Sequence, residues 1–320
     1  MKSSEHELLL PSVEEENICL PLSINAVSKY WNVDLPLSEA IEIAKKYPNV
    51  NGSILIEGIE LAERHGLGSS ILHSSISELK KIIDMGIPPI VILPGLHDII
   101  QHASIISGYD DGEKTIIHYI PQQHKEDQFQ IGVIPEKKFD SLWEEDGRLM
   151  IILAPLDILS EIKIGDKKLD KSNRLCFVSE RLNIQRKSDE AIQSLKKAIE
   201  IDNKNSTAFA LLGGILNEQN SPECIKYYEK SIAINDRCYL AYRGLGNYYL
   251  KNKQYDKAEQ YYTKAIEINT TRFGPIHKNR GLARLEQKKT IEAKQDFENY
   301  LKYTPNAKDK QSILQALREL

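Results

Sequence analysis

The sequence predicts an α+β domain, in which helices come first and an antiparallel sheet follows, and then an all-α array of helical repeats. In the first half, apolar residues recur at helical spacing up to about residue 85 and then gather in short runs that are typical of strands. In the second half, one helical pattern returns at a nearly constant interval. From these observations we expect a first domain at 1–157, a linker at 158–171 and, at 172–320, four repeats with a C-terminal capping helix.

The composition is that of an ordinary globular protein and excludes several classes of function. Of the 320 residues, 41% are hydrophobic and 28% are charged, and the formal net charge of −4 gives no general attraction to nucleic acid or to anionic membranes. The cysteines lack metal-like or redox-motif spacing, which favours free thiols in a reducing compartment. The N-terminal apolar run is too short for a signal peptide, and no stretch approaches the length of a membrane span. We therefore expect a cytoplasmic protein.

Helices are expected first in the N-terminal domain, and strands follow. The expected helices lie at about 19–31, 37–46, 56–65, 77–85 and 135–145. The expected strands lie at 70–72, 89–94, 103–109, 115–119 and 149–154. Ser77 is the expected N-cap of the fourth helix, and Asp110-Asp-Gly112 is the expected turn of a hairpin. This order is typical of an α+β fold and not of a doubly wound α/β fold.

One cysteine lies where a polar, acidic run changes into a helical pattern. Apolar residues after Cys19 recur at Leu22, Ala26 and Tyr30, so the cysteine is expected near the start of a helix that packs into a core. The helix dipole and the free N–H groups at such a position favour a thiolate and can hold an oxyanion. The alternative is a small buried thiol with no chemistry. His102, which precedes a later strand, is a candidate base, although the sequence alone does not select it among the other histidines.

Two motifs in the first half resemble papain-like cysteine peptidases of the bacteriocin-processing, double-glycine type. The stretch Glu14-Glu-Glu-Asn-Ile-Cys-Leu-Pro-Leu-Ser23 is similar to the family's nucleophile segment, which reads Gln-Glu-x-Asn-x-Cys-x-Pro-x-Ser. The stretch His102-Ala-Ser-Ile-Ile-Ser-Gly-Tyr-Asp-Asp111 resembles the strand that the family's histidine opens. The resemblance implies a papain-like fold over nearly all of 10–157, with Cys19 as the nucleophile and His102 as the general base.

Two positions depart from that family's pattern. The oxyanion glutamine of the family falls on Glu14, where a carboxylate repels a developing oxyanion unless it is protonated. The orienting acid or amide before a proline is absent beside Pro121, and Tyr119 or Ile120 occupies the place. A tyrosine can accept a hydrogen bond from an imidazole but carries no charge at neutral pH. The family's two helper positions are therefore altered, while its Cys–His pair is retained.

One pattern of residues recurs in the second half, with anchors that lie 33, 34 and 35 residues apart, at Ala191, Cys224, Ala258 and Ala293. A small residue comes 11 or 12 residues before each anchor, in the order Ser179, Gly213, Gly246 and Gly281. In period and in residue type this pattern resembles tetratricopeptide repeats, in which the small residues let two helices pack closely. The fourth repeat departs, because His277 and Arg280 stand where apolar residues are usual. We expect Cys176, Cys224 and Cys238 to be packing residues of this array.

The resemblance to these repeats implies a concave face lined by the inner helix of each repeat. Arg243 and Asn247 lie one turn apart on the inner helix of the third repeat, and Lys278 and Asn279 lie on the next. Cationic and amide donors that converge on one acceptor can hold a peptide carboxylate. The alternative is an ordinary solvated surface.

Two functions from different classes follow. The first is a cysteine peptidase-like or acyl-transferase-like enzyme, in which Cys19 and His102 act on a peptide recruited by the repeats. The second is a catalytically inactive, peptidase-like adaptor whose two domains bind peptides or protein partners. The sequence shows no metal-ligand set, phosphate loop or nucleotide fingerprint, so neither a metal nor a cofactor is expected.

Overall fold

The computed structural model describes residues 5–7, 19–47, 54–95, 101–120, 130–162 and 166–320. Its contacts divide the chain into two compact units. The first unit contains residues 1–93 and 102–205, and the second contains residues 94–101 and 206–320. The first repeat thus belongs by its contacts to the N-terminal unit. The division at residue 171 that the sequence suggested stays a prediction.

Helices open the N-terminal unit, as the sequence predicts. They are α1 (Cys19–Tyr30), α2 (Leu37–Lys45), α3 (Leu55–Arg64) and, after the first long strand, α4 (Ile76–Asp84). The N-cap of α4 is Ser75 and not Ser77, because the Ser75 hydroxyl accepts a hydrogen bond from the Glu78 N–H at 3.3 Å. Ser75 has extended backbone just before the first helical turn, which is the conformation an N-cap requires.

A seven-stranded sheet follows, with the order β2-β7-β3-β4-β5-β6 and with β1 paired to the end of β4. Its strands are β1 (Glu5–Glu7), β2 (Leu67–His73), β3 (Ile90–Pro94), β4 (Gln101–Asp110), β5 (Thr115–Ile120), β6 (Gln130–Pro135) and β7 (Leu149–Pro155). The pairs β2–β7, β3–β7, β4–β5 and β5–β6 are antiparallel. The predicted hairpin turn is present, and the Asp110 carboxylate accepts a hydrogen bond from the Gly112 N–H at 2.7 Å. Strands β1 and β6 were not among the strands that the sequence predicted.

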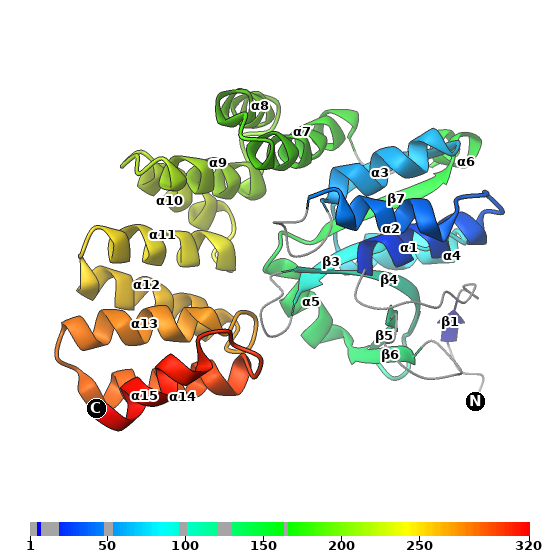
Figure 1. The fold of residues 1–320 in the computed structure, drawn as a ribbon. Helices are drawn as coiled ribbons and strands as arrows, with labels where there is room; N and C mark the ends of the chain where they lie inside the picture. Colours follow the sequence, from blue (N-terminus) through cyan, green and yellow to red (C-terminus); the bar gives the residue numbers. More distant parts are fainter. Residues whose placement is uncertain (1–4, 8–18, 48–53, 96–100, 121–129, 163–165) are drawn as a thin grey trace. The chain divides into compact units, whose positions relative to one another are not determined.

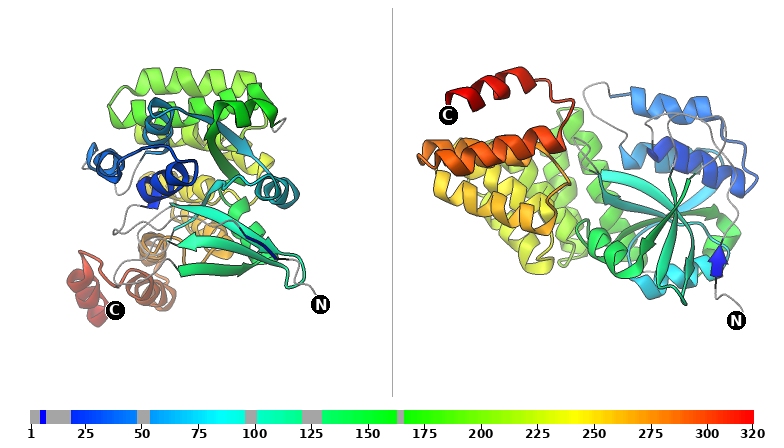
Figure 2. Two further views of the ribbon diagram at one scale, coloured as in Figure 1. Left: turned by 90° about the vertical axis from the view of Figure 1, so that its right-hand side faces the viewer. Right: turned by 90° about the horizontal axis from the view of Figure 1, so that it is seen from below.

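Helices pack on the sheet (Figures 1 and 2), and each face of the sheet carries its own hydrophobic core. On one face, Leu22 of α1 and Ile59 of α3 belong to the same cluster as Ile105 of β4. On the other face, α4 and α5 (Glu136–Glu144) pack against Ile106, with Trp143 fully buried. Neighbouring residues of β4 therefore point to opposite cores, as the two-residue period of a strand requires.

Helix α7 (Lys167–Ile184) closes the outer edge of β2. The Ile71 N–H donates a hydrogen bond to the Asp170 carboxylate at 2.6 Å, and the Ile71 C=O accepts one from the Asn173 amide at 2.8 Å. Phe177 enters the core under α1, and Arg181 pairs with Glu60 at 2.5 Å. The region expected to be a linker instead contains α6 (Leu156–Glu161) and the start of α7. A sheet edge without a strand partner is thus covered by the first repeat helix.

The remaining helices form antiparallel pairs, which Figure 1 shows stacked from α9 to α15. Their bounds are α8 (Ser188–Ile201), α9 (Ser206–Glu218), α10 (Cys224–Ile234), α11 (Tyr239–Lys251), α12 (Tyr255–Ile268), α13 (Pro275–Glu286), α14 (Thr290–Tyr303) and α15 (Lys310–Glu319). With α7, they make four helix pairs and a terminal helix, in agreement with the predicted repeats and cap. Cys176 and Cys224 are buried within these helices, and Cys238 is buried at the N-cap of α11, in agreement with the predicted packing role.

The small residues of the repeats are required by aromatic rings from the following helix. A Cβ built on Gly213 would lie 2.8 Å from the Tyr228 ring, and one on Gly246 would lie 2.6 Å from the Tyr262 ring. Both rings are buried. The two helices of a repeat can approach only because glycine has no side chain there.

The departures of the fourth repeat have a physical explanation. Asp296 of α14 is fully buried and accepts two hydrogen bonds from the Arg280 guanidinium, at 2.7 and 2.9 Å. Arg284 adds a third at 2.8 Å, and His277 lies 3.9 Å from the same carboxylate. A buried ionic cluster therefore replaces the apolar contact usual at these positions.

Candidate functional site

Cys19 is the first residue of α1, as the sequence predicts. Its thiol lies within hydrogen-bonding reach of the Ala103 and Leu20 N–H groups. The thiol thus lies beside Ala103 of strand β4, which is the residue after His102. Burial nevertheless raises the pKa of the Cys19 thiol, and the backbone donors offset this only in part. This balance favours the neutral thiol and not the thiolate that a nucleophile needs.

His102 lies near the start of β4 and is partly buried. The alternation of the strand directs it to the face of Ser104 and Ile106, opposite the face where Ala103 packs under α1. On that face its neighbour is His118 of β5, which pairs with Ile106 in the ladder. The structure therefore brings Cys19 to the backbone beside His102, while the imidazole faces another histidine.

His118 is a functional candidate that the sequence argument did not single out. Its Nδ1 lies 3.1 Å from the Ser104 hydroxyl, which also donates to the Tyr119 C=O at 3.2 Å. Burial lowers the pKa of His118 to about 4, and the neighbouring His102 contributes to this shift. Burial also lowers the pKa of His102. The signal for His118 is its alternation with Ile116, which places both on the face of His102.

Of the two helper residues expected from the sequence, Tyr119 and Glu14, the structure describes only Tyr119. Tyr119 pairs with Ile105 and belongs to the core under α1, so it lies on the face opposite His102. The role expected for it, which was to orient the His102 ring, does not fit this register. Glu14 lies outside the residues that the structure describes. Among the described residues, the thiol therefore lies with the core under α1, while the two histidines and the buried Ser104 lie on the other face of the sheet.

A second candidate site lies on the inner helices of the repeat array. Arg243 precedes Asn247 by one turn of α11. The Asn279 amide of α13 lies 3.4 Å from the Asn247 Oδ1. The same Oδ1 accepts a hydrogen bond from the Tyr262 hydroxyl at 2.7 Å. Arg243 is partly buried, and its Nε has no hydrogen-bond partner among the described residues.

Lys278, the fourth residue expected at this site, points elsewhere. Its ammonium group binds the Asp309 carboxylate at 2.7 Å and lies over the Tyr300 ring, 5.0 Å from the centroid. Tyr300 and Asp309 belong to the junction with the capping helix α15. Adjacent helical residues point in directions about 100° apart, so Lys278 and Asn279 face different neighbours. Lys278 therefore stabilises the cap and is not part of the amide cluster.

A second arginine joins the site from the connection before α13. The guanidinium of Arg243 stacks over the Phe273 ring at 5.0 Å, and that of the fully buried Arg272 lies over the Tyr239 ring at 4.8 Å. Burial lowers the pKa of Arg243, and the charge of Arg272 adds to this. Two positive charges therefore lie near one another here. The feature of the sequence that could have indicated Arg272 is the longer interval between the repeat anchors Ala258 and Ala293.

Two kinds of site are not found in the part of the chain that the structure describes. Among these residues, no group of three or more His, Cys, Asp or Glu side chains is placed to hold a metal ion. None of the described helices combines the length and the apolar character that crossing a membrane requires.

The comparisons with known proteins match the repeat half. Models of the tetratricopeptide repeat match residues 184–205 and 239–271. The C-terminal half therefore contains tetratricopeptide repeats. The papain-like identity of the N-terminal half stays a prediction.

Known relatives share this part of the chain. Anaphase-promoting complex subunit 3 of Schizosaccharomyces pombe is 32% identical over 95 residues, which cover 29% of this chain and 14% of the relative. Type IV pilus assembly protein PilF of Pseudomonas aeruginosa is 27% identical over 124 residues, covering 37% of this chain and 48% of the relative. A solved structure of Pseudomonas aeruginosa PilF has 23% identity and a TM-score of 0.44, and the match covers 48% of this chain and 72% of that chain. The chain thus spans less than half the length of these curated relatives.

Proposed function

We propose that this chain is a non-catalytic adaptor that binds a protein partner through its repeats. The observation that carries this proposal is the cluster of Arg243, Asn247 and Asn279 on the inner helices, with the charge of Arg272 beside it. Guanidinium and amide groups are the kind of donors that recognise an acidic or carboxylate-ended segment. The likeness of the repeats to a subunit of a complex and to a pilus assembly protein supports a role in protein interaction.

The arrangement around Cys19 supports the adaptor over the enzyme. Burial raises the pKa of the thiol, whereas a cysteine nucleophile requires a lowered one. The His102 ring lies on the face of β4 opposite Ala103, whose N–H the thiol approaches. Because the expected orienting residue Tyr119 also lies across the sheet from His102, the imidazole lacks that support. The N-terminal domain then serves as a peptidase-like scaffold and not as a catalyst.

The Arg243 cluster is tested with the peptide Gly-Ala-Glu-Leu-Glu-Asp in two forms, one with a free C-terminal carboxylate and one with a C-terminal amide. We expect the free acid to bind more tightly in calorimetric titrations. We also expect Arg243→Ala to weaken its binding about tenfold, the size of one charge-assisted hydrogen bond. Lys278→Ala is the matched control, and should leave the affinity unchanged because Asp309 holds that side chain. Equal affinities for wild type and Arg243→Ala would reject the Arg243 cluster as the binding site.

The absence of catalysis is tested separately on the thiol. At neutral pH, a thiol-reactive probe should label Cys19 no faster than an unperturbed exposed thiol, since burial favours the neutral form. His102→Ala should leave this rate unchanged. Rapid labelling of the wild type that His102→Ala abolishes would instead establish a Cys19–His102 pair and favour the peptidase.

A further inference from the structure

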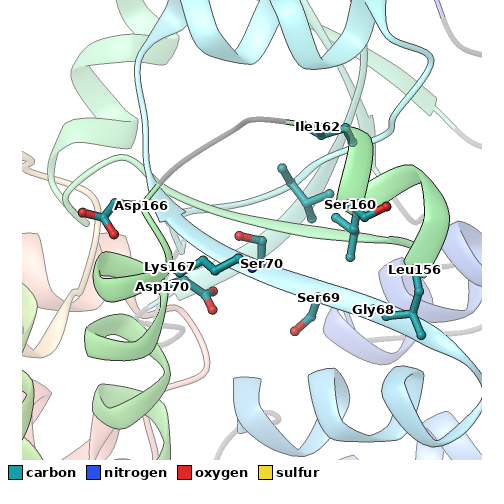
Figure 3. A pocket seen from close by; sticks show the side chains of 11 residues that line it. Gly68, Ser69, Ser70, Leu156, Ser160, Ile162, Asp166, Lys167 and Asp170 are labelled. Atoms are coloured by element: carbon teal, nitrogen blue, oxygen red, sulfur yellow. The ribbon is translucent and has the colours of Figure 1, made fainter.

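A cavity of about 660 Å³ lies in the N-terminal unit, and neither Cys19 nor Arg243 is among its lining residues. Its floor is the beginning of β2, at Gly68, Ser69 and Ser70. Figure 3 shows its two walls, with Leu156 and Ser160 of α6 on one side and the first turns of α7 on the other. This volume lies within the range of about 300–1,000 Å³ that small-ligand sites occupy.

The cavity contains an open piece of sheet edge. Strand β2 is the last strand of the sheet, and Ile71 turns both its N–H and its C=O outward to α7. The register with β7 is unbroken from Leu67 to His73. The N–H and C=O of Ser69 therefore point away from β7, as those of Ile71 do. Among the described residues, the Ser69 N–H and C=O have no backbone partner. A free donor and a free acceptor therefore face the cavity on one residue.

The two walls differ in chemistry. The α6 wall is apolar, and Leu156 is 69% exposed although it is a large aliphatic residue. The missing side chain of Gly68 makes room for this wall, because a Cβ there would lie 2.8 Å from Leu156. The α7 wall is charged and carries two carboxylates, Asp166 and Asp170, against the ammonium of Lys167. Asp170 is the partly buried charge of the three, while the other two side chains are exposed.

We propose that this cavity binds an extended peptide segment in which a basic residue stands beside an apolar one. One residue of the segment pairs with the Ser69 N–H and C=O and extends the sheet past β2. Main-chain bonds of this kind supply affinity, while side-chain pockets supply selectivity. The apolar side chain lies against Leu156, and the basic side chain reaches Asp170. This site is distinct from the Arg243 cluster and does not depend on it.

The test uses the full chain labelled with ¹⁵N and two blocked tripeptides, acetyl-Val-Lys-Leu-amide and acetyl-Val-Glu-Leu-amide. The lysine peptide should shift the Ser69 amide resonance saturably and bind at least about fivefold more tightly than the glutamate peptide, as one partly exposed ion pair allows. Asp170→Asn keeps an oxygen for the Ile71 N–H and should make the two affinities equal. Lys167→Ala, on the same wall, should not weaken the lysine peptide. The absence of a saturable shift at Ser69, or equal affinities in the wild type, would overturn the proposal.

The edge itself is tested with two substitutions at one position. Ser69→Pro removes the outward N–H but no hydrogen bond to β7, because that N–H points away from the sheet. Ser69→Ala keeps the N–H and, like the proline variant, loses the hydroxyl that donates to Glu63 at 2.6 Å. The proline variant should lose binding about tenfold relative to the alanine variant, since the missing donor leaves a peptide carbonyl without a partner. Equal binding by the two variants, both shown to be folded by thermal unfolding, would exclude pairing at this edge.

Discussion

The contacts that stabilise the repeat array join residues close in sequence, whereas those that stabilise the sheet domain join residues far apart in sequence. In the array, Gly246 meets Tyr262 of the next helix, and Arg280 meets Asp296. In the sheet domain, the Trp31 indole donates to the Leu153 C=O across 122 positions, and Asn173 donates to the Ile71 C=O across 102. Contacts within one repeat leave a periodic record in the sequence, whereas contacts between distant segments leave only a burial pattern. The array is therefore predictable in detail and the sheet domain in outline.

The two regions also differ in the polar groups that they bury. The array buries Asp296 as an ion, with two arginine partners. The sheet domain buries His118 beside a serine hydroxyl, in surroundings that favour the neutral ring. The fold loses stability when the partners of a buried ion are removed, and it loses stability when a buried neutral base is protonated. The two regions should therefore respond to different perturbations.

The largest expected effect tests where the boundary between the regions lies. Phe177 belongs to a repeat by sequence but packs into the core under α1. Phe177→Ala should lower the free energy of unfolding by about 3–5 kcal/mol, the usual size for a buried phenylalanine. In hydrogen exchange read by mass spectrometry, protection should fall in the sheet and in α1 and should hardly change in α11 to α14.

The control for this prediction lies on the same helix. Leu169 is 41% exposed, so Leu169→Ala should change the unfolding free energy little. If Phe177→Ala instead loosened α11 to α14 and spared the sheet, α7 would belong energetically to the array.

A somewhat smaller effect should be confined to the array. Asp296→Ala leaves Arg280 and Arg284 without their shared carboxylate, and the loss of one partner of a buried ionic group is strongly destabilising. The two arginines keep 11% and 16% exposure, so we expect the low end of that range, about 3 kcal/mol. Glu298→Ala, at an exposed position of the same helix, is the control. Equal stabilities of the two variants in chemical denaturation would show that the cluster contributes nothing.

The sequence predicted the features that depend on local spacing and not those that depend on contacts between distant segments. The helix starting at Cys19, the hairpin turn at Asp110 and the repeat anchors depend on local spacing, and all appear as expected. The place of Tyr119 depends on strand register, which spacing alone does not fix. The side-chain direction of Lys278 depends on Asp309, which lies beyond the repeat pattern. The binding role of Arg243, Asn247 and Asn279 stays a prediction, and the residues predicted from the sequence did not include Arg272, which lies in the connection between α12 and α13.

The smallest effect concerns the neutral histidine of the sheet domain and depends on pH. Burial lowers the pKa of His118 from an ordinary value of 6.5 to about 4 in the folded chain. Between these values the unfolded chain binds more protons than the folded one, so stability is full above pH 6.5 and falls as the pH drops towards 4. The loss amounts to about 2 kcal/mol after allowance for relaxation of the site. Denaturation of wild type and His118→Gln at pH 7.5 and 5.0 measures it, because the variant cannot titrate there and should lose less stability between the two. If wild type and variant lost the same amount, the acid sensitivity would have to reside in other groups, and the sheet domain would no longer differ from the array in this respect.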